Sequence, residues 1–130
     1  MDILKLKELL KKAYAPYSNF QVAACAIDEE GNEFYGVNVE NAAYPSGLCA
    51  ERSALFGSIA YGGKVGKFKE IHIISKKEGI ISPCAGCRQV FVELMKSDAK
   101  VYQYSNDTKQ VRVNTVEELV PFSVKESDIK

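Results

Sequence analysis

Three cysteines in two short stretches place the strongest constraint on how this chain can fold. Cys84 and Cys87 stand at the predicted start of a helix. Ser82 is a suitable cap for that helix, and Pro83 suits its first position, where a missing N–H costs nothing. Residues three apart share a helix face, and zinc binds each sulfur at about 2.3 Å in a tetrahedral shell. The spacing of Cys84 and Cys87 therefore predicts half of a metal site.

The earlier stretch, Cys49-Ala50-Glu51-Arg52, offers a third sulfur with an acid beside it. Residues two apart lie on nearly opposite sides of a regular helix, so Cys49 and Glu51 can serve one centre only if Cys49 lies at the helix entrance. The proline and glycine of residues 45–47 favour a break there. Three protein ligands leave zinc one position for water, which is typical of catalytic rather than structural sites. Glu51 beside that water is predicted to transfer protons.

Together the two stretches resemble the zinc-dependent cytidine deaminase family, specifically its small three-cysteine form that acts on free nucleosides. The ligand-Ala-Glu motif of the family corresponds to residues 49–51, and its Pro-Cys-x-x-Cys motif to residues 83–87. The resemblance also includes Tyr14-Ala15-Pro16-Tyr17-Ser18-Asn19-Phe20, Asn38-Val39-Glu40-Asn41-Ala42 and Arg88-Gln89-Val90. It covers the chain from about Lys11 to Phe122.

The resemblance implies hydrolytic deamination of cytidine and 2′-deoxycytidine to uridine and 2′-deoxyuridine, with release of ammonia, as a step of pyrimidine salvage. Glu51 would be the catalytic residue, and one zinc ion per chain would be bound by Cys49, Cys84 and Cys87. Arg52 would hydrogen-bond a ligand sulfur and offset the negative charge of three thiolates, with Arg88 as a further candidate for that role. The implied substrate contacts come from Phe20, Asn38, Glu40, Ala50 and Phe122.

Two of these implied contacts have an alternative in ordinary packing. Phe20 could equally belong to the core, and from the sequence alone Phe122 would pack on its own domain. Small deaminases of this kind are homotetramers in which a carboxy-terminal aromatic residue of one subunit covers the base bound by another. The resemblance therefore implies a homotetramer with shared active sites, in which Phe122 has that role.

Length and charge exclude other classes of protein. The 130 residues suit a single domain, residues 1–130. Basic and acidic residues number 17 each, so no net charge attracts long nucleic acid. No apolar run approaches the roughly 20 residues of a membrane span, and no membrane partner is expected. Four cysteines without a secretory segment indicate a reducing compartment, so we expect a cytoplasmic protein.

Hydrophobic periodicity predicts an α/β domain around one mixed sheet. Strands are predicted over residues 20–27, 33–39, 69–75, 101–104 and 110–113. Helices are predicted over residues 2–13, 48–61 and 83–96, and a short last helix follows the capping box at Thr115. The helix positions expected to face the core are Leu55, Phe56, Ile59, Ala60, Val90, Phe91 and Leu94. The resemblance implies a three-layer α/β/α fold with five strands and with the two cysteine helices side by side on one face.

Two other functions remain open at this point. A binding module with a closed structural zinc site would need a fourth ligand, which Cys25 or the single histidine, His72, could supply. Their apolar neighbours favour ordinary strand positions for both residues. A deaminase for a nucleoside antibiotic related to blasticidin would share every catalytic residue, and substrate assays separate it from a cytidine deaminase.

Overall fold

A mixed five-stranded sheet forms the centre of the computed structural model, which describes residues 1–130. Its strands lie in the order β2-β1-β3-β4-β5. Strands β3 and β4 are parallel, and the other neighbouring pairs are antiparallel. The strands are β1 (Val22–Asp28), β2 (Glu33–Val37), β3 (Phe68–Ser75), β4 (Met95–Tyr104) and β5 (Val111–Thr115).

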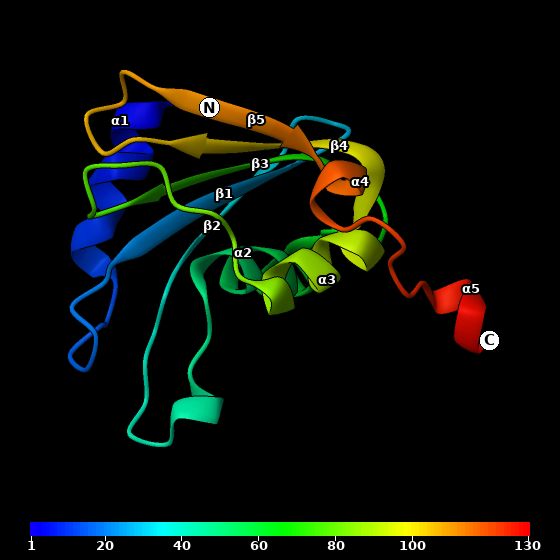
Figure 1. Ribbon diagram of the computed structural model, residues 1–130, viewed down its shortest axis with the longest axis horizontal. Helices are drawn as coiled ribbons and strands as arrows, with labels where there is room; N and C mark the ends of the chain where they lie inside the picture. The colour runs from blue at the N-terminus through cyan, green and yellow to red at the C-terminus, as the bar shows by residue number, and fades with distance from the viewer.

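Helices cover both faces of this sheet, as the three-layer prediction requires. Figure 1 shows α2 and α3 side by side on one face, with α1 on the other. The helices are α1 (Ile3–Glu8), α2 (Ala50–Ser58), α3 (Ala85–Leu94), α4 (Val116–Leu119) and α5 (Glu126–Ile129). Short 3₁₀ turns follow α1 and α2 (Leu9–Lys12 and Ile59–Tyr61), and a third precedes α2 (Tyr44–Ser46). None of these helices has the length and apolar character needed to cross a membrane.

Alternation along the central strands divides the core into two parts. Successive side chains of a strand point to opposite faces, so Ala24 of β1 joins the larger core under α2 and α3, whereas Cys25 joins the smaller core under α1. On β3, Ile71 and Ile73 belong to the larger core. Strand β1 is buried along its whole length, as expected for a strand covered on both faces.

The parallel pair β3 and β4 fixes where α3 begins. A parallel connection needs a crossover element, and here α3 is that element. The amino terminus of α3 therefore lies beyond the carboxyl end of β3, on the face that α2 also covers. This arrangement brings the cysteines at the starts of α2 and α3 to the same edge of the molecule.

Gly36 on β2 lets α2 lie directly against the sheet. A Cβ atom at this position would lie 2.4 Å from the backbone nitrogen of Ala54 and 2.6 Å from the carbonyl oxygen of Ala50. Both atoms belong to the backbone of α2, so a side chain here could be accommodated only by moving the helix. The close approach sets the depth at which the first turn of α2 lies.

Gly36→Ala should destabilise the protein by about 1–3 kcal/mol, because the extra methyl group overpacks a rigid contact. That loss corresponds to a melting temperature lower by roughly 5–15 °C in calorimetry. Gly57→Ala is the matched control, because a Cβ at Gly57 meets no atom within 4 Å. Alanine there should leave the melting temperature unchanged or raise it, since glycine is a poor helix former. Equal melting temperatures for wild type and Gly36→Ala would contradict the close-contact interpretation.

Several boundaries and burial predictions from the sequence are wrong. Helix α3 begins at Ala85 with Cys84 as its N-cap, so Ser82 is not the cap and Pro83 precedes the helix. The strand predicted over residues 101–104 begins at Met95, because the chain turns into the sheet directly after Leu94. On α2 only Leu55 of the expected core positions is buried.

The other three positions, Phe56, Ile59 and Ala60, are exposed. Helix α2 packs on the sheet through Ala50, Ala54, Leu55 and Ser58. Phe56 and Ile59 therefore fall on the opposite face, with 46% and 45% of their surfaces exposed. On α3 the prediction is confirmed for Phe91 and Leu94, which are buried, whereas Val90 is half-buried.

Candidate active site

Two helix amino termini meet at the site, and each presents a cysteine as its N-cap. Cys49 caps α2 in an extended conformation, which confirms that it lies at the helix entrance. Cys84 caps α3, and its Sγ accepts a hydrogen bond of 3.4 Å from the backbone N–H of Cys87. The positive ends of both helix dipoles stabilise thiolates at these positions.

The three sulfur atoms are spaced for one metal ion. Cys49 Sγ and Cys84 Sγ lie 3.8 Å apart, and all three sulfurs of Cys49, Cys84 and Cys87 lie within 4.8 Å of one another. A tetrahedral zinc with bonds of about 2.3 Å separates its sulfur ligands by about 3.8 Å. Cys87 is buried, Cys49 half-buried and Cys84 exposed. The donor set thus fits zinc and keeps one side open for a further ligand.

Neither alternative fourth ligand belongs to this cluster. Cys25 is fully buried in the smaller core. His72 lies on β3, where its Nδ1 is 2.7 Å from the Tyr104 hydroxyl and its Nε2 is 3.0 Å from a Glu70 carboxylate oxygen. Its ring also stacks on Tyr102 at 4.4 Å between centroids. The prediction that both are ordinary strand residues is confirmed, and a closed four-ligand site built with either is excluded.

Arg52 contacts the thiolate cluster as expected. Its Nη2 donates a hydrogen bond of 3.3 Å to Cys49 Sγ. The pKa of the Cys49 thiol falls to about 5, first because the Cys87 thiol hydrogen-bonds to it and then because Arg52 does. Arg88, the other arginine considered for this role, donates instead to the backbone carbonyls of Pro83 and Leu119, so that proposal is wrong.

Glu51 is an acid held almost out of water beside the cysteines. Only 4% of its surface is exposed. Burial raises the pKa of its carboxyl to about 7, and the negative charge of Cys49 acts in the same direction. A carboxyl group whose pKa lies near neutrality can both accept and donate a proton, which is the property a general acid–base residue needs.

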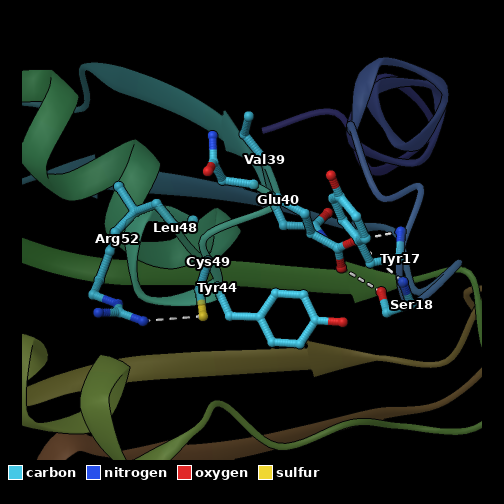
Figure 2. Close-up of a pocket in the computed structure, with 11 residues that line it drawn as sticks. Tyr17, Ser18, Val39, Glu40, Tyr44, Leu48, Cys49 and Arg52 are labelled. Carbon is cyan, nitrogen blue, oxygen red and sulfur yellow. Dashed lines mark hydrogen bonds between the residues drawn. The ribbon is translucent and has the colours of Figure 1, made fainter.

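A cavity of about 410 Å³ opens beside the cluster, within the range of roughly 300–1,000 Å³ that small-molecule sites occupy. Figure 2 shows Cys49 and Arg52 at one end and Glu40, Tyr17 and Ser18 at the other. The remaining lining residues are Asn38, Val39, Asn41, Tyr44, Gly47 and Leu48. The cavity is therefore polar at both ends, with aromatic and aliphatic side chains between them.

Two of the five residues expected to bind substrate line this cavity. The Asn38 side chain accepts from Val22 N at 2.8 Å and donates to Phe20 O at 2.8 Å, which fixes its orientation. One Glu40 carboxylate oxygen accepts from the backbone N–H groups of Tyr17 and Ser18 at 3.0 and 3.1 Å. The other oxygen accepts from the Ser18 hydroxyl.

The other three lie outside the cavity lining. Phe20 packs partly against the larger core, and Ala50 is fully buried in it. Phe122 is fully exposed on the tail after α4, so packing on its own domain is excluded. In Figure 1 that tail runs outward beyond α3, away from the loop before α2 that lines the cavity.

Some residues that shape the site were given no role from the sequence. Tyr17 and Tyr44 pack edge to face at 5.8 Å at the cavity, and Ser18 anchors Glu40. Arg112 of β5 donates to the Ser82 hydroxyl at 2.6 Å and so holds the loop that leads into Cys84. The polar and aromatic run at residues 14–20 was one available signal, whereas nothing local marks Arg112.

Fold and site together define a class: an α/β domain with an open three-thiolate zinc centre and a buried acid at two converging helix termini. A family model described as the cytidine and deoxycytidylate deaminase zinc-binding region matches residues 3–104. This chain belongs to that family, and zinc is its cofactor.

Individual relatives agree with the family match. A cytidine deaminase from Sporosarcina psychrophila is 37% identical over 99% of this chain and 96% of its own length. The crystal structure of a cytidine deaminase from Burkholderia pseudomallei superposes with a TM-score of 0.84 at 42% identity, covering 95% of this chain and 100% of that one. The cytidine deaminase from Mycobacterium tuberculosis gives a TM-score of 0.78 at 28% identity, over 96% and 98% of the two chains.

Proposed function

We propose that this protein is an enzyme that removes the amino group of cytidine and 2′-deoxycytidine by hydrolysis, giving uridine and 2′-deoxyuridine plus ammonia. The observation that carries this proposal is the buried Glu51 beside the three-cysteine group, whose Cys49 lines one end of the cavity. The two cytidine deaminases of known structure compared above match this chain over nearly their whole length. The product nucleosides point to a role in pyrimidine salvage, and the four free cysteines suit a reducing cytoplasm.

Glu51 supplies the proton transfers that the reaction needs. The overall change replaces the C4–N bond of the base by a C4=O bond and uses one water molecule. As water adds to C4, the Glu51 carboxylate accepts its proton and delivers it to N3. The proton of the new C4 hydroxyl then passes through the same carboxyl to the amino group, so that C4=O forms as the C4–N bond breaks and ammonia leaves. A pKa near neutrality suits both directions of transfer.

Cys49, Cys84 and Cys87 would hold zinc, which would lower the pKa of the attacking water so that addition could occur at neutral pH. Three thiolates leave a divalent ion with a net negative charge, which works against this effect. Arg52, hydrogen-bonded to Cys49 Sγ, draws electron density from the cluster. The helix dipoles of α2 and α3 act in the same direction.

The cavity supports a free nucleoside as substrate. Glu40 lies at the end away from Cys49, where the ribose of a bound nucleoside would lie if its base faced Glu51. A carboxylate has about four acceptor positions, and the bonds from Tyr17 and Ser18 leave room for a ribose hydroxyl. Asn38 keeps a second amide hydrogen for the same hydroxyl. These two residues are our proposed ribose contacts.

To test this function, purified zinc-loaded protein is incubated with cytidine. The reaction is followed by the loss of cytosine absorbance and by the release of ammonia. Parallel reactions with 2′-deoxycytidine and a blasticidin-type nucleoside define the substrate class. Turnover of both pyrimidine nucleosides is the expected result. If only the antibiotic is deaminated, the substrate is the antibiotic and not cytidine. If none of the three compounds releases ammonia, the proposal that this protein is a deaminase is overturned.

The same proposal includes a homotetramer in which Phe122 covers the base bound by a neighbouring subunit. Phe122 is fully exposed and so is free to reach another chain. The outer face of α2 and the turn after it also expose large apolar side chains: Phe56, Ile59 and Tyr61. Exposed apolar groups clustered on one helix face are typical of subunit contacts.

Phe122→Ala should raise the KM for cytidine about 10- to 100-fold, because a stacked aromatic covering is lost. Zinc content should stay at one ion per chain. Ile129→Ala is the matched control, since Ile129 is another exposed apolar residue of the tail, and its KM should not change.

Coexpression locates the chain in which Phe122 acts. Phe122→Ala subunits mixed with Glu51→Gln subunits form some sites that combine an intact Glu51 with an intact Phe122 from the neighbour. At cytidine concentrations well below the raised KM of Phe122→Ala, where both parents turn over little substrate, hybrid oligomers should then be more active than either parent. Hybrids no more active than the parents would restrict Phe122 to its own subunit.

A further inference from the structure

Helix α3 holds the tail that carries Phe122 at two backbone carbonyls. Arg88 Nη1 donates to Leu119 O at 3.3 Å, at the end of α4. Gln89 Nε2 donates to Val124 O at 3.0 Å, two residues beyond Phe122. Adjacent residues of one helix thus fix both ends of the segment 119–124, which we call the tail arch.

The tail arch holds Phe122 in a conformation it would not keep without support. The backbone of Phe122 has φ of 55°, in the left-handed region that a bulky L-residue rarely adopts. Its side chain is fully exposed, so no packing in its own domain offsets that strain. Strained backbone persists only where the surroundings fix it. Hydrogen bonds at Leu119 and Val124 provide that fixation from the two sides.

Arg88 also contacts the cysteine loop of its own chain. Its Nε donates a bond of 2.9 Å to Pro83 O, directly before the zinc ligand Cys84. A guanidinium presents several donors in a rigid plane, so one side chain can serve two carbonyls at once. The planar group therefore joins the loop that presents Cys84 to the tail arch that presents Phe122.

We propose that Arg88 is a positioning residue that sets Phe122 for the nucleoside site of a neighbouring subunit, with Gln89 as a second tie. This inference rests on the proposed function, because it assigns Phe122 to the neighbour's base. It adds a link between two sites: the side chain that orders the Cys84 loop of one subunit also orders the base cover of the next. Arg88 acts through Phe122 and contacts no reacting atom.

The first test measures the tail arch alone and needs no deaminase activity. The chain contains no tryptophan, so Phe122→Trp introduces a single indole whose fluorescence anisotropy reports the mobility of the arch. Arg88→Met in this background removes the bond to Leu119 O in the tail arch, and with it the bond to Pro83 O, while keeping an unbranched side chain of similar length. Gln89→Ala removes the other tie to the arch, at Val124 O. Both should lower the anisotropy. Glu93→Ala, at an exposed residue of α3, should leave it unchanged.

The second test measures catalysis and asks whether Arg88 works through Phe122. Arg88→Met should raise the KM for cytidine about tenfold, the effect expected for hydrogen bonds from a charged donor, with kcat within about twofold. Gln89→Ala should raise it about threefold. In the double variant with Phe122→Ala, the Arg88 substitution should add less than about twofold, because two changes in one coupled unit are not additive. Arg88→Lys keeps the charge but not the planar fork and should recover only part of the loss.

The outcomes separate this inference from the proposed function. Unchanged anisotropy in the Arg88→Met variant would show that Arg88 does not hold the tail arch, whatever the enzymatic activity is. Multiplying KM effects of Arg88→Met and Phe122→Ala, or loss of zinc from Arg88→Met, would show that Arg88 acts on its own cysteine loop and would overturn its positioning role. Absence of deamination in the wild type would overturn the proposed function, while the anisotropy test still decides the tether.

Discussion

Glu51→Gln should reduce kcat for cytidine by at least about 10⁴-fold while zinc remains bound. General acid–base residues typically contribute about 10²–10⁴-fold, and Glu51 is assigned more than one proton transfer, so the upper end is expected. The amide keeps the shape of the carboxyl in a site that is 4% exposed but cannot accept the proton from water. Steady-state kinetics together with metal analysis of the same preparation give both quantities.

Glu93→Gln on the exposed side of α3 serves as the charge-matched control and should keep wild-type kcat. Binding of a hydrated pyrimidine analogue to Glu51→Gln would show that its cavity is still formed. A Glu51→Gln protein with a tenth of wild-type turnover would assign the proton transfers to another group. Zinc loss in this variant would instead mean that the carboxyl supports the metal site.

The second large effect is expected on the metal. Cys84→Ser should lose most of the bound zinc and nearly all activity, because a hydroxyl is a poor zinc ligand and two thiolates do not complete a stable site. Cys84 is exposed, so the substitution disturbs no core packing, and serine still caps α3. Since metal binding is coupled to folding, the variant should also melt at a lower temperature, and adding a chelator should no longer change that melting temperature.

Cys25→Ala and His72→Ala are the matched variants for this experiment. Both residues lie away from the three sulfurs, so each protein should retain one zinc ion per chain after dialysis. The number of zinc ions per chain, measured by atomic absorption before and after chelation, distinguishes Cys84→Ser from these two variants. Full zinc content in Cys84→Ser, or zinc loss in His72→Ala, would contradict the three-cysteine assignment.

The elements that the sequence predicted well are those governed by short-range chemistry. The Thr115 side chain accepts from Glu118 N, and the Glu118 carboxylate accepts from Thr115 N, which is the capping box that the sequence indicated. The helix predicted to begin at Asp2 has an equally local cap, since the Asp2 side chain accepts from the backbone N–H groups of Leu4 and Lys5. Each contact joins residues within one turn, so adjacent letters of the sequence determine it.

Burial on α2 was predicted less well, because hydrophobicity alone does not say which apolar face meets the sheet. Leu55 and Phe56 are neighbours of similar hydrophobicity, yet Leu55 is buried and Phe56 is half exposed. The close contact of Gly36 with Ala50 and Ala54 orients the helix, and that contact joins separate elements. The sequence contained the glycine but not its position opposite α2.

For the site, the sequence by itself predicted the three-cysteine group and the acid beside it. Two local motifs identify the three cysteines and Glu51. A single helix turn also sets the spacing of Cys84 and Cys87. Tertiary structure alone decided how the two stretches meet. The 3.8 Å separation of Cys49 Sγ and Cys84 Sγ, across 35 positions of the chain, exists because the crossover helix α3 packs beside α2.

The partners of Arg88 show the same division most clearly. From the sequence, Arg88 follows a zinc ligand and was a candidate to contact its sulfur. In the fold its guanidinium reaches the carbonyl of Leu119, 31 positions away, because α4 returns over α3 after β5. Arginine's charge and planar donors were fixed by residue type, but the acceptors they reach depend on which distant segments the sheet order brings beside α3.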